Sequence, residues 1–260
     1  MKKFSILIAL LLLNLSSSTF AATTKNEWLL EQSYSEIGEH KIYVSPDAVR
    51  IVCPKQGFSV IAKAPNWDAY CFRNDNKKLW VGKFNTFTGD LLLNPFAVPK
   101  YSFEPLRPDK EVKYDGIDCS TYLSDKEGSV VYGSKTMAVA PMTCEFLCRY
   151  FNIPKMHEVP LFRRIEPSSR KVVPKAGADK AWLGDTAIKE QPSKTRIVLS
   201  TSSIKKIGYK SSDFELPKDY RLAKDAGDIG VTGAQRSQIG AALDELGFSS
   251  DYVRNEKKDK

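Results

Sequence analysis

Five cysteines are the residues of this chain best suited to chemistry: Cys53, Cys71, Cys119, Cys144 and Cys148. Cys144 and Cys148 lie four positions apart, so a helix would place both on one face. A disulfide is the default for cysteines in an exported protein. We expect one from Cys119 to Cys144 or Cys148, because a strand and a helix can pack face to face, whereas a bridge within one helix turn would be strained. The odd number leaves at least one thiol free.

Two further uses of these thiols stay open. A metal site would need Cys119, Cys144, Cys148 and His157 to converge tetrahedrally. A redox pair would use Cys144 and Cys148, although their spacing is not the C-x-x-C of disulfide oxidoreductases. We expect structural burial with one disulfide, no metal and no cofactor.

Histidine occurs only at positions 40 and 157, which limits any mechanism that depends on an imidazole base to these two sites. Neither His40 nor His157 sits in a recognisable catalytic motif, and the chain has no phosphate loop, nucleophile elbow or zinc-protease helix. Asp115 and Asp118 form an acidic pair of the kind common in turns. The sequence therefore predicts a protein that is not an enzyme.

The first residues have the three parts of a secretory signal. Lys2 and Lys3 supply the positive charge, residues 4–13 are almost entirely apolar, and small residues end the segment at Ala22. The apolar stretch is shorter than the roughly 20 residues that span a bilayer. We expect residues 1–22 to be removed and the mature protein to be exported to the periplasm or the extracellular space.

The basic residues are spread among acidic ones rather than concentrated in a patch. The formal net charge is +8, and Lys2 and Lys3 contribute two of these units. A scattered distribution is typical of a solvated surface, so we expect no nucleic-acid partner. Weak attraction to an anionic membrane surface remains an alternative, while the oligomeric state is left open.

Strand signals dominate the first half of the mature chain. Residues 41–93 contain β-branched and apolar runs separated by turn residues, which predicts an antiparallel sheet or barrel. Residues 94–118 are rich in proline and predict an edge or a loop. Strand signals return in the segments 110–114, 120–123, 129–132 and 196–200.

Two helices are predicted between and after these strands. Pro141 can begin the first, since Cys144, Leu147, Cys148 and Phe151 repeat at helical spacing. Residues 232–246 carry the capping and apolar pattern of a second helix, and residues 249–260 predict a disordered polar tail.

Several segments, taken in order, resemble the LolA-like family of lipoprotein carriers. Tyr43–Ile51 resembles the opening hairpin, Lys113–Tyr122 a later strand with a glycine turn, and Phe214–Tyr220 the closing Phe-x-x-Pro-x-x-Tyr segment. The resemblance implies an α+β fold, a curled antiparallel half-barrel with helices packed on its concave face. It implies one domain over residues 23–248, with insertions at 94–112 and 141–194 and a cavity that shelters acyl chains in some members.

We therefore expect an exported, non-enzymatic protein that binds a hydrophobic or lipid-like ligand, such as an acyl chain, between sheet and helices. Tyr70 and Phe72 share one strand face, and Leu147 and Phe151 share the apolar side of the predicted helix; these four are the candidate cavity lining. Two alternatives remain. One is an envelope structural or interaction protein with a filled core, and the other is a thiol-dependent redox or metal-binding protein.

Overall fold

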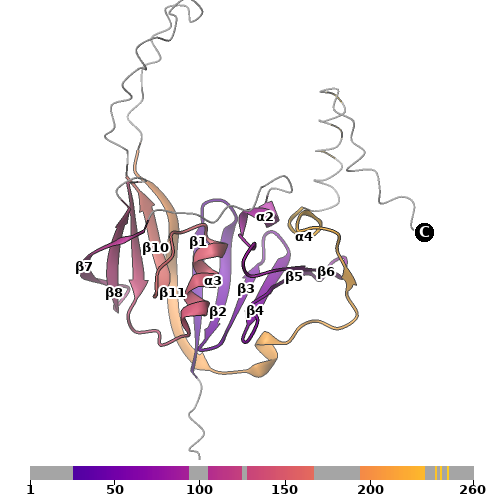
Figure 1. The fold of residues 1–260 in the computed structure, drawn as a ribbon, viewed down its shortest axis with the longest axis horizontal. Coiled ribbons are helices and arrows are strands. Elements are labelled where there is room, and N and C mark those ends of the chain that lie inside the picture. The colour runs from indigo at the N-terminus through magenta and orange to yellow at the C-terminus, as the bar shows by residue number, and fades with distance from the viewer. Residues whose placement is uncertain are drawn as a thin grey trace, which may run out of the picture.

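The computed structural model describes residues 26–93, 105–124, 128–166 and 194–231, together with positions 238, 241 and 245. Its strands form one sheet in the order β12-β6-β5-β4-β3-β2-β1-β11-β10-β9-β8-β7 (Figure 1). All neighbours pair antiparallel except β12 and β6. The strands are β1 (Asn26–Tyr34), β2 (Gly38–Ser45), β3 (Ala48–Cys53), β4 (Phe58–Lys63), β5 (Ala69–Arg73), β6 (Lys78–Gly82), β7 (Arg107–Tyr114), β8 (Ile117–Ser124), β9 (Ser129–Ser134), β10 (Val159–Ile165), β11 (Arg196–Gly208) and β12 (Arg221–Leu222).

The predicted α+β class is wrong, because the described chain is mainly β and its sheet is not closed. Its helices are α2 (Asp90–Leu93), α3 (Pro141–Tyr150), α4 (Gly227–Gly230) and the 3-10 turn η1 (Ser211–Phe214). Among the helices whose bounds the structure describes, only α3 exceeds one turn, so these helices form no layer over the face of the sheet as the family resemblance implied. None of the described helices is long and apolar enough to cross a membrane.

The core begins as a row of side chains across the sheet. Strand register places Leu30 beside Ile42, Ile42 beside Ile51, Ile51 beside Val60, and Val60 beside Cys71. None of the five is exposed to solvent. Each such aliphatic side chain contributes roughly 1.5–3 kcal/mol through burial, so the row holds five strands in register.

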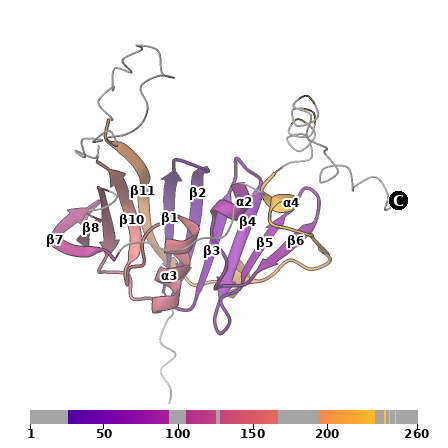
Figure 2. The ribbon, with the colours of Figure 1, turned by 45° about the horizontal axis from the view of Figure 1, so that its top comes forward.

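Helix α3 lies over this core face, in front of β1, β2 and β11 (Figures 1 and 2). It begins at Pro141, whose missing N–H costs nothing in the first turn. Phe146 stacks on Phe87 with ring centroids 5.2 Å apart. The backbone approaches α2 so closely that a Cβ at Gly89 would lie 2.0 Å from the carbonyl oxygen of Tyr150. Glycine is therefore required at position 89 for this contact.

The chain after β11 crosses the opposite face of the sheet, and we call residues 209–223 the strap. Phe214 of the strap is buried, and its carbonyl accepts a hydrogen bond from Nζ of Lys63 at 3.3 Å. Arg50 donates to the carbonyl of Asp213 at 3.2 Å. The strap ends as β12, which adds the last strand beside β6.

Three features of the chain either differ from what the sequence predicted or fall outside the described residues. Strand β1 had no strong period-two signal and was not predicted. Strand β10 tolerates Pro160 because its register shifts there by a bulge. The signal segment 1–22, the tail 249–260 and the apolar side of the predicted helix 232–246 lie outside the described residues, although positions 238, 241 and 245 are helical and exposed.

Candidate functional site

The space between α3 and the sheet was the predicted ligand site, and the side chains of α3 occupy it. Leu147 and Phe151, two of the predicted lining residues, are buried in the core, and Phe151 packs edge-on against Tyr34 with centroids 5.4 Å apart. Tyr150 packs against Phe151 at 5.0 Å. These rings pack against one another in the space between α3 and the sheet.

The other two predicted lining residues lie on the opposite face of the sheet. Successive residues of a strand alternate between faces, and Ala69 and Cys71 are those that join the α3 core. Tyr70 and Phe72 therefore point toward the strap. Phe72 meets Tyr220 of the strap edge-on at 6.0 Å. The sheet therefore lies between Tyr70 and Phe72 on one side and the α3 side chains predicted to line the same cavity on the other.

The predicted disulfide is wrong: all five cysteines are free thiols, and all are buried. Cys144 donates a hydrogen bond through Sγ to the backbone carbonyl of His157 at 3.4 Å, while Cys119 turns back toward the carbonyl of Ile117 at 3.5 Å. Both of these thiols are thus satisfied locally, and the sequence could not reveal which face of β8 would carry Cys119.

Burial makes these thiols weak acids. Desolvation raises the pKa of Cys119 to about 11, and it raises the pKa values of Cys144 and Cys148 to about 12. Glu158 adds to the rise at Cys119 and Cys144, because its negative charge opposes a nearby thiolate. A thiolate is the nucleophile in cysteine chemistry, so the environment suppresses reactivity.

The hypothetical metal ligands do not gather. The side chain of His157 is exposed, whereas Cys119, Cys144 and Cys148 are buried. Among the residues that the structure describes, no group of three or more histidine, cysteine or acidic side chains could hold a metal ion.

A buried polar chain that the sequence did not reveal links β2, α3 and β3. Nε2 of His40 lies 2.9 Å from the hydroxyl of Tyr150, and the same hydroxyl lies 3.1 Å from Sγ of Cys53. Burial lowers the pKa of His40 to about 4 and raises that of Cys53 to about 12. The three groups are neutral and enclosed, which suits a structural network better than proton transfer.

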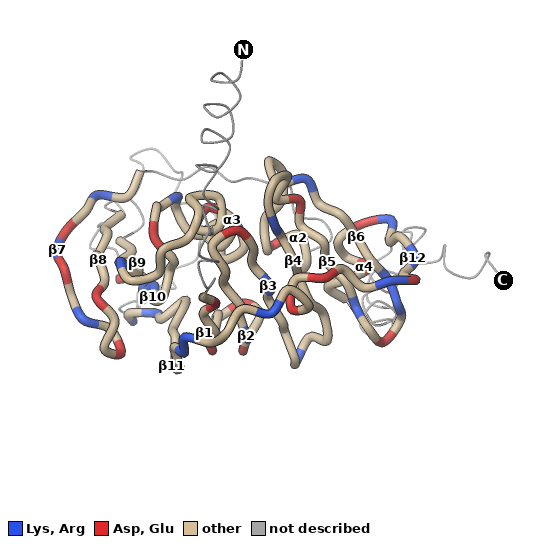
Figure 3. The backbone as a smooth tube through the Cα atoms, turned by 90° about the horizontal axis from the view of Figure 1, so that it is seen from below, with Lys and Arg blue, Asp and Glu red and all other residues tan. Residues whose placement is uncertain are grey.

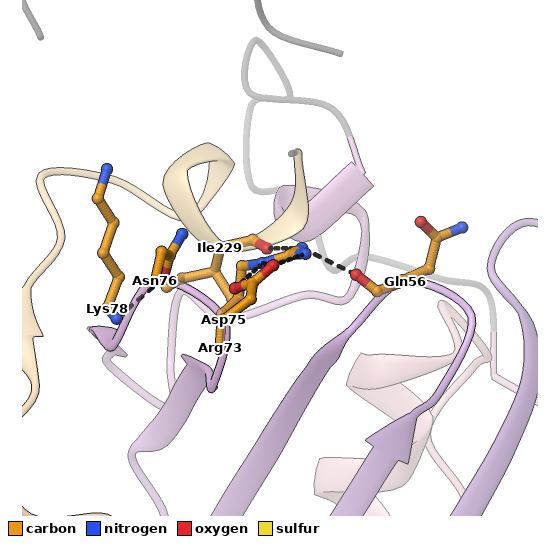
Figure 4. Close-up of polar contacts among 6 residues, drawn as sticks. All are labelled: Gln56, Arg73, Asp75, Asn76, Lys78 and Ile229. Atoms are coloured by element: carbon orange, nitrogen blue, oxygen red, sulfur yellow. Dashed lines mark hydrogen bonds and ion pairs between the residues drawn. The ribbon is translucent and has the colours of Figure 1, made fainter. Parts of the chain in front are cut away.

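A second polar cluster fixes α4 against the end of β5 (Figure 4). Arg73 is only 3% exposed. Its Nη1 donates to the carbonyls of Gln56 at 2.8 Å and Ile229 at 3.0 Å, and Nη2 donates to Asp75 at 2.7 Å. The guanidinium lowers the pKa of Asp75. One side chain therefore ties β5 to a neighbouring turn and to α4.

One end of the sheet exposes a charged strand. Five positions of β7 alternate in charge, as the red and blue segments show in Figure 3; they are Arg107, Asp109, Lys110, Glu111 and Lys113. Pro108 and a register shift interrupt the strand. Charges, proline and bulges on an edge strand discourage pairing with other chains.

Comparison with known proteins gives no family. No protein-family model matches the sequence, and no curated protein matches it significantly. The fold is similar to an uncharacterized conserved protein from Thermus thermophilus, with a TM-score of 0.31 and 10% identity over 78% of this chain and 91% of that one. It is also similar to PNGF-II, with a TM-score of 0.39 and 10% identity over 78% of this chain and 31% of that one. Such low scores say nothing about activity, and the LolA-like resemblance stays a prediction.

Proposed function

We propose that this chain is an exported, non-enzymatic interaction protein of the cell envelope, which works through the surface of its sheet. The observation that carries this proposal is the filled interior. Phe146, Leu147, Tyr150 and Phe151 are each at most 1% exposed, and they occupy the space between α3 and the sheet. A ligand between these elements would have to displace core side chains, which pack as densely as a molecular crystal.

The side chains that could do chemistry support a role without catalysis. The thiols are buried with raised pKa values, and His40 is enclosed beside Tyr150. Groups placed in this way contribute to stability, because the Tyr150 hydroxyl gives both His40 and Cys53 a hydrogen-bond partner inside the core. A partner would therefore contact the outside of the sheet, through exposed backbone groups of its strands and its charged side chains.

Export is tested separately from the filled interior. Fusion of residues 1–30 to a periplasmic reporter enzyme should give activity outside the cytoplasm, because residues 1–22 have the order of a secretory signal. Reversal of Lys2 and Lys3 to glutamate should reduce that activity. A reporter that stays inactive with the natural segment would contradict export.

The interior is tested with a fluorescent fatty acid on the purified protein. We expect no saturable binding to the folded chain, since its core is already occupied. Stoichiometric binding that an unlabelled fatty acid displaces would contradict the filled interior and restore the ligand-carrier interpretation.

A further inference from the structure

Strand β11 is paired along one edge for most of its length and along the other for only its first residues. β1 pairs with β11 from Leu199 to Gly208. β10 pairs only with Arg196, Ile197 and Leu199 before it diverges. Within the described ranges, no strand pairs with residues 200–208 on the side that β10 leaves.

We call residues 203–208 of β11, on the side that β10 leaves, the open edge, and at the point of divergence a side chain takes the place of the missing strand. The hydroxyl of Tyr114 donates to the carbonyl of Thr201 at 2.9 Å and accepts from the amide of Thr201 at 3.1 Å. A side chain thus supplies the two bonds that a neighbouring strand would make. From Ser203 to Gly208, alternate backbone groups face the same side, and the described chain provides no neighbouring strand there.

The open edge differs in kind from the protected edge at β7. From Arg196 to Lys210 the chain contains no acidic residue and no proline. Ile204 and Ile207 are β-branched residues that favour an extended backbone. The edge thus carries charge of one sign and no proline, so its lysines discourage pairing with a basic strand and favour an acidic one.

Its charge indicates what kind of chain would pair with it. Lys205 and Lys206 are exposed, and Lys210 follows them, also exposed; they belong to the blue part of β11 in Figure 3 and its continuation. Consecutive residues point to opposite faces of a strand, so the edge is basic on both sides. A strand with acidic side chains on either face would meet a lysine there.

We propose that the open edge of β11, residues 203–208, binds an extended acidic segment of a partner protein by strand addition. Main-chain hydrogen bonds provide affinity in this mode, and side-chain contacts provide selectivity. The inference rests on the proposed interaction function and specifies its partner.

The test uses the folded chain without residues 1–22 and a short capped peptide of alternating glutamate and valine that carries a fluorophore. Anisotropy should show saturable binding. Joint replacement of Lys205→Glu and Lys206→Glu should weaken it by about tenfold or more, because the charges would then repel. The matched control is Lys55→Glu, an exposed lysine in the turn after β3, three strands from β11 in the sheet, which should leave affinity unchanged.

Two further measurements distinguish strand addition from general attraction between charges. The peptide should slow hydrogen exchange of amides in residues 203–208, and the same peptide N-methylated at alternate residues should not bind. Absence of saturable binding, equal weakening by Lys55→Glu, or equal binding of the methylated peptide would overturn the inference. These failures would leave the filled interior and export intact, since fatty-acid displacement and the reporter fusion test those.

Discussion

Nε2 of His40 and the hydroxyl of Tyr150 lie 2.9 Å apart in a site where neither side chain is more than 2% exposed. This contact joins β2 to α3, the longest helix that the structure describes. It places a titratable ring in a region that disfavours charge, so the stability of the α3 packing should depend on pH.

The pH dependence has a definite sign. Burial lowers the pKa of folded His40 from 6.5 to about 4. Between these values the unfolded chain binds the extra proton, so the free energy of unfolding falls as the pH falls. Near pH 4 the free energy of unfolding should therefore be about 3 kcal/mol lower than at neutral pH. Urea unfolding across this window should show the loss, and His40→Gln should reduce its slope. An identical slope in that variant would contradict the assignment.

Tyr114→Phe should destabilise the protein by about 1–3 kcal/mol, because the amide and carbonyl of Thr201 would lose their shared partner. Tyr132→Phe is the matched control. The ring of Tyr132 lies in the same aromatic cluster, 5.8 Å from Tyr114, and its hydroxyl is not the group that bonds Thr201. Equal effects of both changes in urea unfolding would mean that the Tyr114 hydroxyl is not the source of stability.

Arg73→Ala should cost about 3–5 kcal/mol, since it removes a buried cation that Asp75 and two carbonyls surround. Lys83→Ala is a useful comparison. Lys83 also contacts an aspartate, Asp68 at 2.7 Å, but its side chain is 76% exposed, so solvent screens the pair and little stability should be lost. If Arg73→Ala were as mild as Lys83→Ala, the cluster in Figure 4 would not anchor α4.

The native protein should resist thiol reagents. All five cysteines are buried and free, so a colorimetric thiol assay should detect almost none before unfolding and all five in denaturant. A peptide map under non-reducing conditions should contain no cross-linked cysteine peptides. Rapid labelling of the native protein would contradict the burial of the thiols.

Local patterns predicted individual elements better than they predicted the architecture. Turn residues and β-branched runs identified β3, β4 and β5, and the spacing from Cys144 to Phe151 identified α3. The class was wrong because it followed the family resemblance, and two predicted helices do not show how much of a sheet helices cover. The pairing of Cys119 was wrong for a related reason: the one-residue register of β8 determines where its thiol points.

The candidate site shows the same limit. Tyr70 and Phe72 lie on one face of β5, and the sequence predicted that this face lines a ligand cavity. In the structure Tyr220 of the strap packs against Phe72 on that face. The contacts of Arg73 with Gln56 and Ile229 join residues far apart in the chain. No local pattern predicts them, because they depend on how the strands pair and on where α4 returns to the sheet.

The central claim is that the interior is filled by the protein's own side chains, and Leu147→Ala tests it most directly. Leu147 is 1% exposed, so its truncation should cost about 2–5 kcal/mol and leave an apolar cavity. Fluorescent fatty-acid or small apolar probes should show no saturable binding to the natural chain, while the truncated chain should gain binding of a small apolar probe such as benzene. Saturable binding of the fatty acid to the natural chain, with little loss of stability in Leu147→Ala, would contradict the account.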